Sequence, residues 1–117
     1  MPQLAGSAVL NAAAYNHSLD MGQRGYFEHD TPDGVTPTDR AQAAGYPGQV
    51  AENIAAGNET AQATFEQWRT SPDHNANMLA DNAVIGIGRV FVEGSEFGWY
   101  WTIKFGGIAD EPPANCG

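Results

Sequence analysis

The chain is poor in cysteine and in basic residues, and these shortages exclude several classes of protein. Cys116 is the only cysteine among 117 residues, so no intramolecular disulfide and no cysteine-based zinc or iron–sulfur site can form. Five Lys and Arg stand against 14 Asp and Glu, which gives a net charge of −9. Nucleic-acid phosphates and anionic lipid headgroups are bound by clustered basic residues, so the charge argues against both partners.

Long apolar runs are missing as well. No stretch is apolar for long enough to span a membrane. The N-terminal sequence MPQLAGSAVL lacks the charged region and apolar core of a signal peptide. We therefore expect a chain that is not exported, or a domain of a longer precursor. With 42% hydrophobic and 16% charged residues, the composition is that of one globular domain.

Hydrophobic periodicity and turn residues predict four helices, one strand and a β-hairpin. The helices are expected at about residues 7–23, 36–44 and 60–70, followed by a short one after Ser71-Pro72, where Ser71 is expected to cap through its side chain. The strand is expected at 49–55, and the hairpin pairs 83–92 with 99–105. This order predicts an α+β fold in which helices cover an antiparallel sheet.

Several positions carry a specific packing expectation. Gly86 and Gly88 lie inside the first hairpin strand, and glycine there indicates close approach of another backbone. His17 falls on the apolar face of the first helix and is expected to be a hydrogen-bonded core residue. Trp68 is expected in the core, and Arg40 is expected to hold the loop before the second helix.

Two histidines and a glutamate are the candidates for chemistry. His29 precedes the turn Pro32-Asp33-Gly34, Glu52 lies in the middle of the predicted strand, and His74 follows a helix break. A carboxylate in such a strand must face solvent, a cation or a hydrogen-bond network. Two His and one Glu form a ligand set suited to Zn²⁺ with a position left for water. The sequence has no His-Glu-x-x-His motif, and an acidic pair of the glycosidase type stays open.

A set of short motifs resembles the bacterial branch of the CAP superfamily, the domain of cysteine-rich secretory proteins, antigen 5 and pathogenesis-related 1, also called the SCP domain. The pieces follow the family order over about residues 4 to 107. They are His17-Ser18-x-Asp20-Met21, Gly25-Tyr26-Phe27-x-His29, Pro32-Asp33-Gly34, Arg40, Gly45-Tyr46, Ala51-Glu52-Asn53-Ile54-Ala55-x-Gly57, Trp68-x-x-Ser71-Pro72-x-His74, Met78-Leu79, Ile85-Gly86-x-Gly88 and Trp101-Thr102.

The resemblance implies an α-β-α sandwich with a central cleft that carries two His and two Glu in plant and animal members, some of which bind a divalent metal. By position, the cleft residues are His29, Glu52 and His74. The second Glu is replaced by Ser71, and Asp73 stands close enough in sequence to supply an acid. Residues 1–107 are then one domain without a counterpart of the first family helix, and 108–117 are an extended tail.

The resulting expectation is a secreted or cell-envelope domain whose cleft binds a divalent metal, Zn²⁺ being the first candidate, and a small or lipid-like ligand or an envelope component. No turnover is inferred. Two other hypotheses stay open. In one, the domain is a metal-dependent hydrolase in which Glu52 or Asp73 acts as base. In the other, it is a structural or adhesion module with a vestigial cleft.

Overall fold

A computed structural model describes residues 5–80 and 82–107 of the chain, so the predicted tail at 108–117 lies outside the described residues. The elements follow one another in the order β1 (Ala5–Gly6), α1 (Ala8–Arg24), α2 (Pro37–Ala43), β2 (Val50–Ala56), α3 (Ala61–Arg69), α4 (Pro72–Leu79), β3 (Val84–Phe91) and β4 (Trp99–Gly106). Each predicted helix and strand is present, with ends within about two residues of the expected ones.

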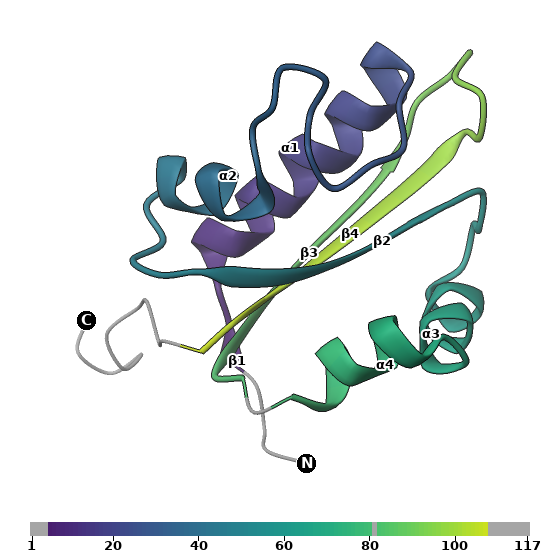
Figure 1. Cartoon of the computed structure of the whole chain (residues 1–117). Coiled ribbons are helices and arrows are strands. Elements are labelled where there is room, and N and C mark those ends of the chain that lie inside the picture. Colours follow the sequence, from purple (N-terminus) through teal and green to yellow (C-terminus); the bar gives the residue numbers. More distant parts are fainter. Residues whose placement is uncertain (1–4, 81, 108–117) are drawn as a thin grey trace.

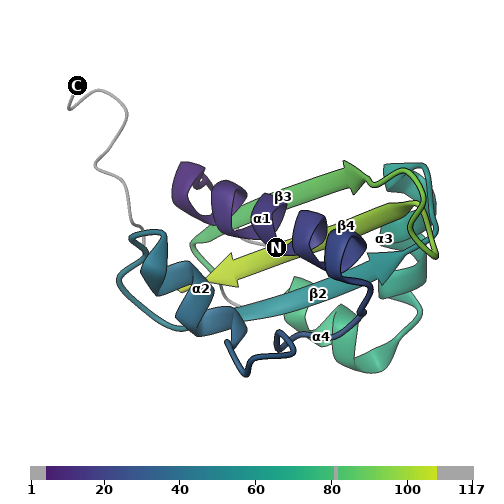
Figure 2. The same ribbon diagram turned by 90° about the horizontal axis from the view of Figure 1, so that it is seen from above.

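The sheet has four strands in the order β1-β3-β4-β2. The β2–β4 and β3–β4 pairs are antiparallel, as predicted. The short strand β1 was not predicted; its two residues pair in parallel with β3, which makes the sheet mixed. A strand this short has no periodicity to detect in the sequence. Helices α1 and α2 cover one face of the sheet, and α3 and α4 cover the other (Figures 1 and 2).

Polar caps fix where the helices begin. The Ser7 hydroxyl accepts a hydrogen bond from the Leu10 N–H at the start of α1, and Thr60 caps α3 in the same way. Helix α1 ends at Gly25, whose φ of 74° is readily adopted only by glycine. Ser71 occupies the N-cap position of α4, but the expected side-chain bond is absent: its backbone closes α3 and opens α4 instead.

The core has one layer on each side of the sheet. On the α3 side, Trp68 is fully buried against alternate residues of β4, and its Nε1–H donates to the Ile54 carbonyl across 2.9 Å. On the α1 side, Leu10 packs against Tyr46 and Val84. Strand β4 also reaches the α1 side, where its Tyr100 packs against Met21, because neighbouring side chains of a strand point to opposite faces.

Helix α1 lies directly on the glycines of β3. A Cβ atom added to Gly86 would stand 2.2 Å from the Leu10 carbonyl carbon, and one added to Gly88 would stand 2.3 Å from the Tyr15 nitrogen. The close approach predicted for these glycines is confirmed. It brings α1 down to the sheet, which places His17, in the middle of the helix, beside the cluster described below.

We predict that Gly88→Ala lowers the free energy of unfolding by about 1–3 kcal/mol or more, because the methyl group must push the backbone of α1 away from the sheet. Urea unfolding measures the loss. Gly6→Ala is the control, since nothing lies within 4 Å of the added Cβ there. Equal stability of the two variants would contradict the packing described.

Candidate functional site

The candidate site is centred on Glu52, in the middle of β2. This residue pairs with Lys104 of β4 across the antiparallel register. The Glu52 side chain is 1% exposed and that of Lys104 is completely buried. Both therefore point into the layer beneath α1 and α2, whereas the neighbouring Asn53 points to α4 on the opposite face. The sequence prediction that Glu52 and Asn53 face opposite ways is confirmed.

The Glu52 carboxylate is held on both oxygens. Its Oε1 accepts a hydrogen bond from Nδ1 of His29 across 2.9 Å. Its Oε2 accepts from the Lys104 ammonium at 2.5 Å and from the Arg40 guanidinium at 3.0 Å. The ring of His17 lies 3.9 Å from Oε1. The predicted need for a cation or a polar network is thus met by two cations and an imidazole.

These neighbours decide the charge states in the cluster. Burial on its own would raise the pKa of Glu52, but the His29 hydrogen bond and the positive Lys104 bring it down to about 2. For Lys104 burial is the larger influence, and it lowers the pKa to about 8 in spite of the carboxylate beside it. At neutral pH both groups are therefore ionised, and they form a buried ion pair with Arg40 as the second cation.

Arg40 ties the loop before α2 to this carboxylate. One guanidinium nitrogen donates to the His29 carbonyl at 2.8 Å, and the other donates to the Val35 carbonyl at 3.1 Å. The expected loop-holding role of Arg40 is confirmed. Arg40 lies in the first turns of α2, and a capping box formed by Thr36 and Asp39 fixes the start of this helix. Arg40 therefore positions His29 through the backbone, while Glu52 orients its ring.

Helix α4 brings His74 to β2 from the other side. The Asn53 side chain donates to the His74 carbonyl at 3.1 Å, and Asn77 donates to the Asn53 side chain at 2.9 Å. Burial, followed by the charge of His29, lowers the pKa of His74. Its Nδ1 atom is buried and makes no hydrogen bond. His74 therefore lies within range of the charge of His29, and His29 in turn contacts Glu52.

The remaining predicted positions lie at the edge of this arrangement. Asp73 is exposed in the first turn of α4, where its charge partly offsets the lowering of the His74 pKa. Ser71 is half-buried at the N-cap of the same helix. His17 is fully buried, and its Nε2–H donates to the Glu28 carbonyl at 2.9 Å, so the prediction of a core histidine is confirmed.

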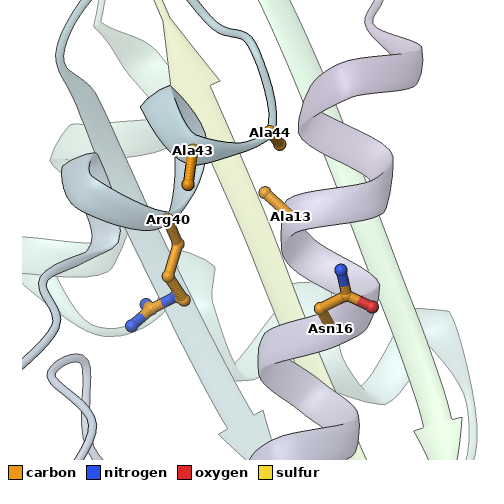
Figure 3. A pocket seen from close by; sticks show the side chains of 5 residues that line it. All are labelled: Ala13, Asn16, Arg40, Ala43 and Ala44. Carbon is orange, nitrogen blue, oxygen red and sulfur yellow. The ribbon is translucent and has the colours of Figure 1, made fainter. Parts of the chain in front are cut away.

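A hollow of about 270 Å³ lies between α1 and α2, beside Arg40. Its walls are Ala13, Asn16, Arg40, Ala43 and Ala44 (Figure 3). The guanidinium end of Arg40 extends away from the alanines, so the hollow contacts its aliphatic stem (Figure 3). None of the predicted cleft residues lines this hollow, and we therefore place the candidate site at the histidines.

Comparisons with known proteins identify the family of this chain. Residues 1–105 match the cysteine-rich secretory protein family, CAP. The chain belongs to the CAP family. It is 35% identical over 99 residues to the uncharacterized protein YkwD of Bacillus subtilis (strain 168), covering 83% of this chain and 37% of that protein.

Solved structures show the same architecture. An extracellular protein containing an SCP domain from Bacillus anthracis str. Ames has a TM-score of 0.75 at 32% identity, over 90% of this chain and 34% of that one. An outer surface protein from Borrelia burgdorferi has a TM-score of 0.81 at 20% identity, over 93% and 80% of the two chains. This CAP domain spans about a third of the two Bacillus proteins. The predicted α-β-α sandwich is confirmed.

Lys104 is the site residue that the sequence analysis missed. Strand alternation puts Lys104 on the same face as Tyr100 and Thr102, and this alone predicts no partner for it. The available signal was its position in the middle of the strand WYWTIKFG, where every residue after Trp99 is buried. A lysine in such a strand requires a buried anion, and the only strand carboxylate that the register places opposite it is Glu52.

Two features are absent from the described residues. Across residues 5–80 and 82–107, no helix is long and apolar enough to cross a membrane. Within the same ranges, no three His, Cys, Asp or Glu side chains are grouped so that they could hold a metal ion together. The structure thus brings His29 into contact with Glu52 and near His74, but it does not form a three-ligand cage from them.

We predict that Glu52→Gln lowers the free energy of unfolding by about 3–5 kcal/mol, because it leaves the buried Lys104 without its counter-charge. Lys104→Met costs less, since Glu52 keeps Arg40 and His29. The double variant recovers much of the loss, because neither charge of the pair remains in the core. Urea unfolding of the four proteins measures this coupling, and strictly additive losses would contradict the ion pair.

We also predict that His17 contributes an acid-sensitive part of the stability. Burial lowers its pKa from 6.5 to about 4, so the folded state binds fewer protons than the unfolded state between these values. Above pH 6.5 the neutral His17 costs no stability. As the pH falls from 6.5 to 4, the free energy of unfolding drops by at most about 3 kcal/mol, because protonation favours the unfolded state. In His17→Gln the free energy of unfolding depends less steeply on pH in this window, by the equivalent of up to one bound proton. An unchanged slope contradicts the prediction.

Proposed function

We propose that this CAP domain is a secreted or cell-envelope binding module whose cleft holds a divalent metal, such as Zn²⁺, through His29 and His74. The observation that carries the proposal is the hydrogen bond from His29 Nδ1 to the Glu52 carboxylate. Metal-binding imidazoles usually donate their second ring N–H to a carboxylate, which fixes the tautomer and makes the other nitrogen a better ligand. Nε2 of His29 is then the nitrogen with the free lone pair.

Glu52 suits the role of orienting group better than that of a ligand. Its Oε2 contacts the ammonium of Lys104 and the guanidinium of Arg40. A metal bound to this carboxylate would displace these contacts or face their positive charge. The proposal therefore keeps the predicted trio of His29, Glu52 and His74 as one site, but assigns the metal to the two imidazoles.

His74 supports the same assignment. A buried ring nitrogen without a hydrogen bond is unfavourable, and a bound metal or ligand would satisfy it. Burial, the largest cause of its lowered pKa, favours the neutral imidazole of His74, which is the form that binds metals. Two protein ligands leave the other positions of the metal to water or to a bound molecule.

The charge state of Glu52 favours binding over turnover. A carboxylate with a pKa of about 2 that is held by two cations is a weak general base, so the hydrolase hypothesis receives less support. Two structural neighbours are an extracellular protein and an outer surface protein. Their location supports a ligand that is a small or lipid-like molecule, or a component of the cell envelope.

The proposal predicts that Zn²⁺ binds to the wild-type protein with a stoichiometry of one, measured by isothermal titration calorimetry. His29→Ala and His74→Ala each abolish or strongly weaken binding. Glu52→Gln weakens it by about 10–100-fold, because the imidazole loses its orienting carboxylate. Melting curves confirm that each variant is folded at the titration temperature.

Glu96→Gln is the control for adventitious binding, because it removes an exposed carboxylate from the β3–β4 loop. It leaves the titration unchanged if the histidines hold the metal. Equal affinity of the wild-type protein and the His29/His74 double variant rejects the site.

A further inference from the structure

Two exposed phenylalanines from different loops contact one another beside the candidate site. Phe27 follows α1 and is 42% exposed, and Phe97 lies in the β3–β4 loop and is 45% exposed. Their ring centres are 6.3 Å apart in an edge-to-face arrangement. The two loops meet at the end of the sheet where β3 passes into β4 (Figure 1). Phe27 is only two residues from His29, so the Cα atoms of these two residues are at most about 7 Å apart.

Hydrogen bonds fix the β3–β4 loop before anything binds to it. The Val92 N–H donates to the Gly98 carbonyl at 2.8 Å, and the Ser95 hydroxyl accepts from the Gly98 N–H at 3.1 Å. The ring of Phe97 also packs edge-to-face against the buried Tyr100. Phe97 is therefore held in one place although its outer surface is open to solvent.

The loop that carries Phe27 is held on both sides of the ring. The Tyr26 hydroxyl donates to Asp20 at 2.6 Å, and the Glu28 carbonyl accepts from Nε2 of His17 at 2.9 Å. Because both rings are already ordered, a ligand that binds to them does not have to offset the entropy of fixing two loops.

The surroundings of this phenylalanine pair are acidic. The two loops, residues 25–36 and 92–98, contain five Asp and Glu but neither Lys nor Arg. Glu28 and Asp30 are exposed in the first loop, and Glu93 is exposed in the second. Carboxylates and the negative faces of aromatic rings both attract a cation, and both repel an anionic ligand.

The arginines of the chain already occupy the aromatic rings next to the pair. The guanidinium of Arg24 lies 5.6 Å from the centre of the Tyr26 ring, and that of Arg89 lies 4.0 Å from the centre of the Trp99 ring. Within residues 5–80 and 82–107, no Arg or Lys lies over either ring of the phenylalanine pair. Tyr26 and Trp99 thus have internal cations, whereas the phenylalanine pair offers the same chemistry to solvent.

We propose that the phenylalanine pair binds a small quaternary ammonium compound with a short apolar tail. The cationic head lies over the exposed ring faces, which attract it and which suit a cation without N–H groups, and the tail packs on the rings. The proposal rests on the binding role given above and names the class of ligand, but it does not involve the metal. Insertion of the rings into a membrane is disfavoured, since an anionic leaflet repels the flanking carboxylates.

An NMR titration of the isotope-labelled, metal-free protein tests the proposal with three probes that share one hexyl chain: hexyltrimethylammonium, hexanol and hexanoate. We expect the quaternary ammonium to bind most tightly and hexanoate most weakly, with amide shifts concentrated in residues 25–36 and 92–98. Phe27→Ala and Phe97→Ala each weaken binding of the quaternary ammonium by about two- to fivefold, which corresponds to one cation–π contact at an exposed site. Tyr15→Ala is the control, because this tyrosine is 49% exposed on α1, outside both loops.

Charge variants separate attraction of the cation from packing of the tail. Glu28→Gln weakens binding of hexyltrimethylammonium and leaves that of hexanol unchanged. Glu66→Gln makes the same change of net charge on α3, where it only breaks an exposed ion pair, and it alters neither. The His29→Ala/His74→Ala double variant keeps the ammonium site and loses Zn²⁺, so the two proposals fail independently.

Two results overturn the proposal. One is hexanoate binding as tightly as hexyltrimethylammonium. The other is hexyltrimethylammonium shifting no amide of the two loops, whether or not the protein sediments with phosphatidylcholine vesicles.

Discussion

The buried ion pair between Glu52 and Lys104 is the interaction on which the candidate site depends. It links the edge strand β2 to the central strand β4 within the layer under α1 and α2. Because the carboxylate also accepts from Arg40 and His29, one buried charge fixes a helix, a loop and two strands relative to one another. The cost of burying these charges is offset only while the whole set of partners is present.

In this arrangement, buried charged groups support an exposed histidine. Glu52, Lys104 and Arg40 are nearly or completely shielded from solvent, whereas the His29 side chain is 48% exposed. The buried groups therefore act through His29, which they hold in one tautomer and one orientation. Helix α4 adds His74 from the opposite face of the sheet through the amides of Asn53 and Asn77. The proposed site is thus assembled around an edge strand, where both faces of the sheet can be reached.

The glycines of β3 impose a second constraint. Because Gly86 and Gly88 have no side chains, α1 packs against the strand backbone itself. The same helix carries the buried His17, whose ring lies within 3.9 Å of the Glu52 carboxylate. Close packing of α1 therefore also affects the carboxylate, because the His17 ring beside it is one of the groups that lower the pKa of Glu52.

The sequence by itself determined the elements and the fold class, and it singled out His29, Glu52 and His74 as candidates, because periodicity, caps and short family motifs are local signals. It also determined that Glu52 needs a charged or polar environment, since an unpaired carboxylate in such a strand is costly. Only the tertiary structure identified Lys104 as its partner, because they are 52 residues apart and meet through strand register. It also decided that His29 donates to Glu52 and that Ser71 does not cap through its side chain. These outcomes depend on contacts between distant segments, which no local pattern encodes.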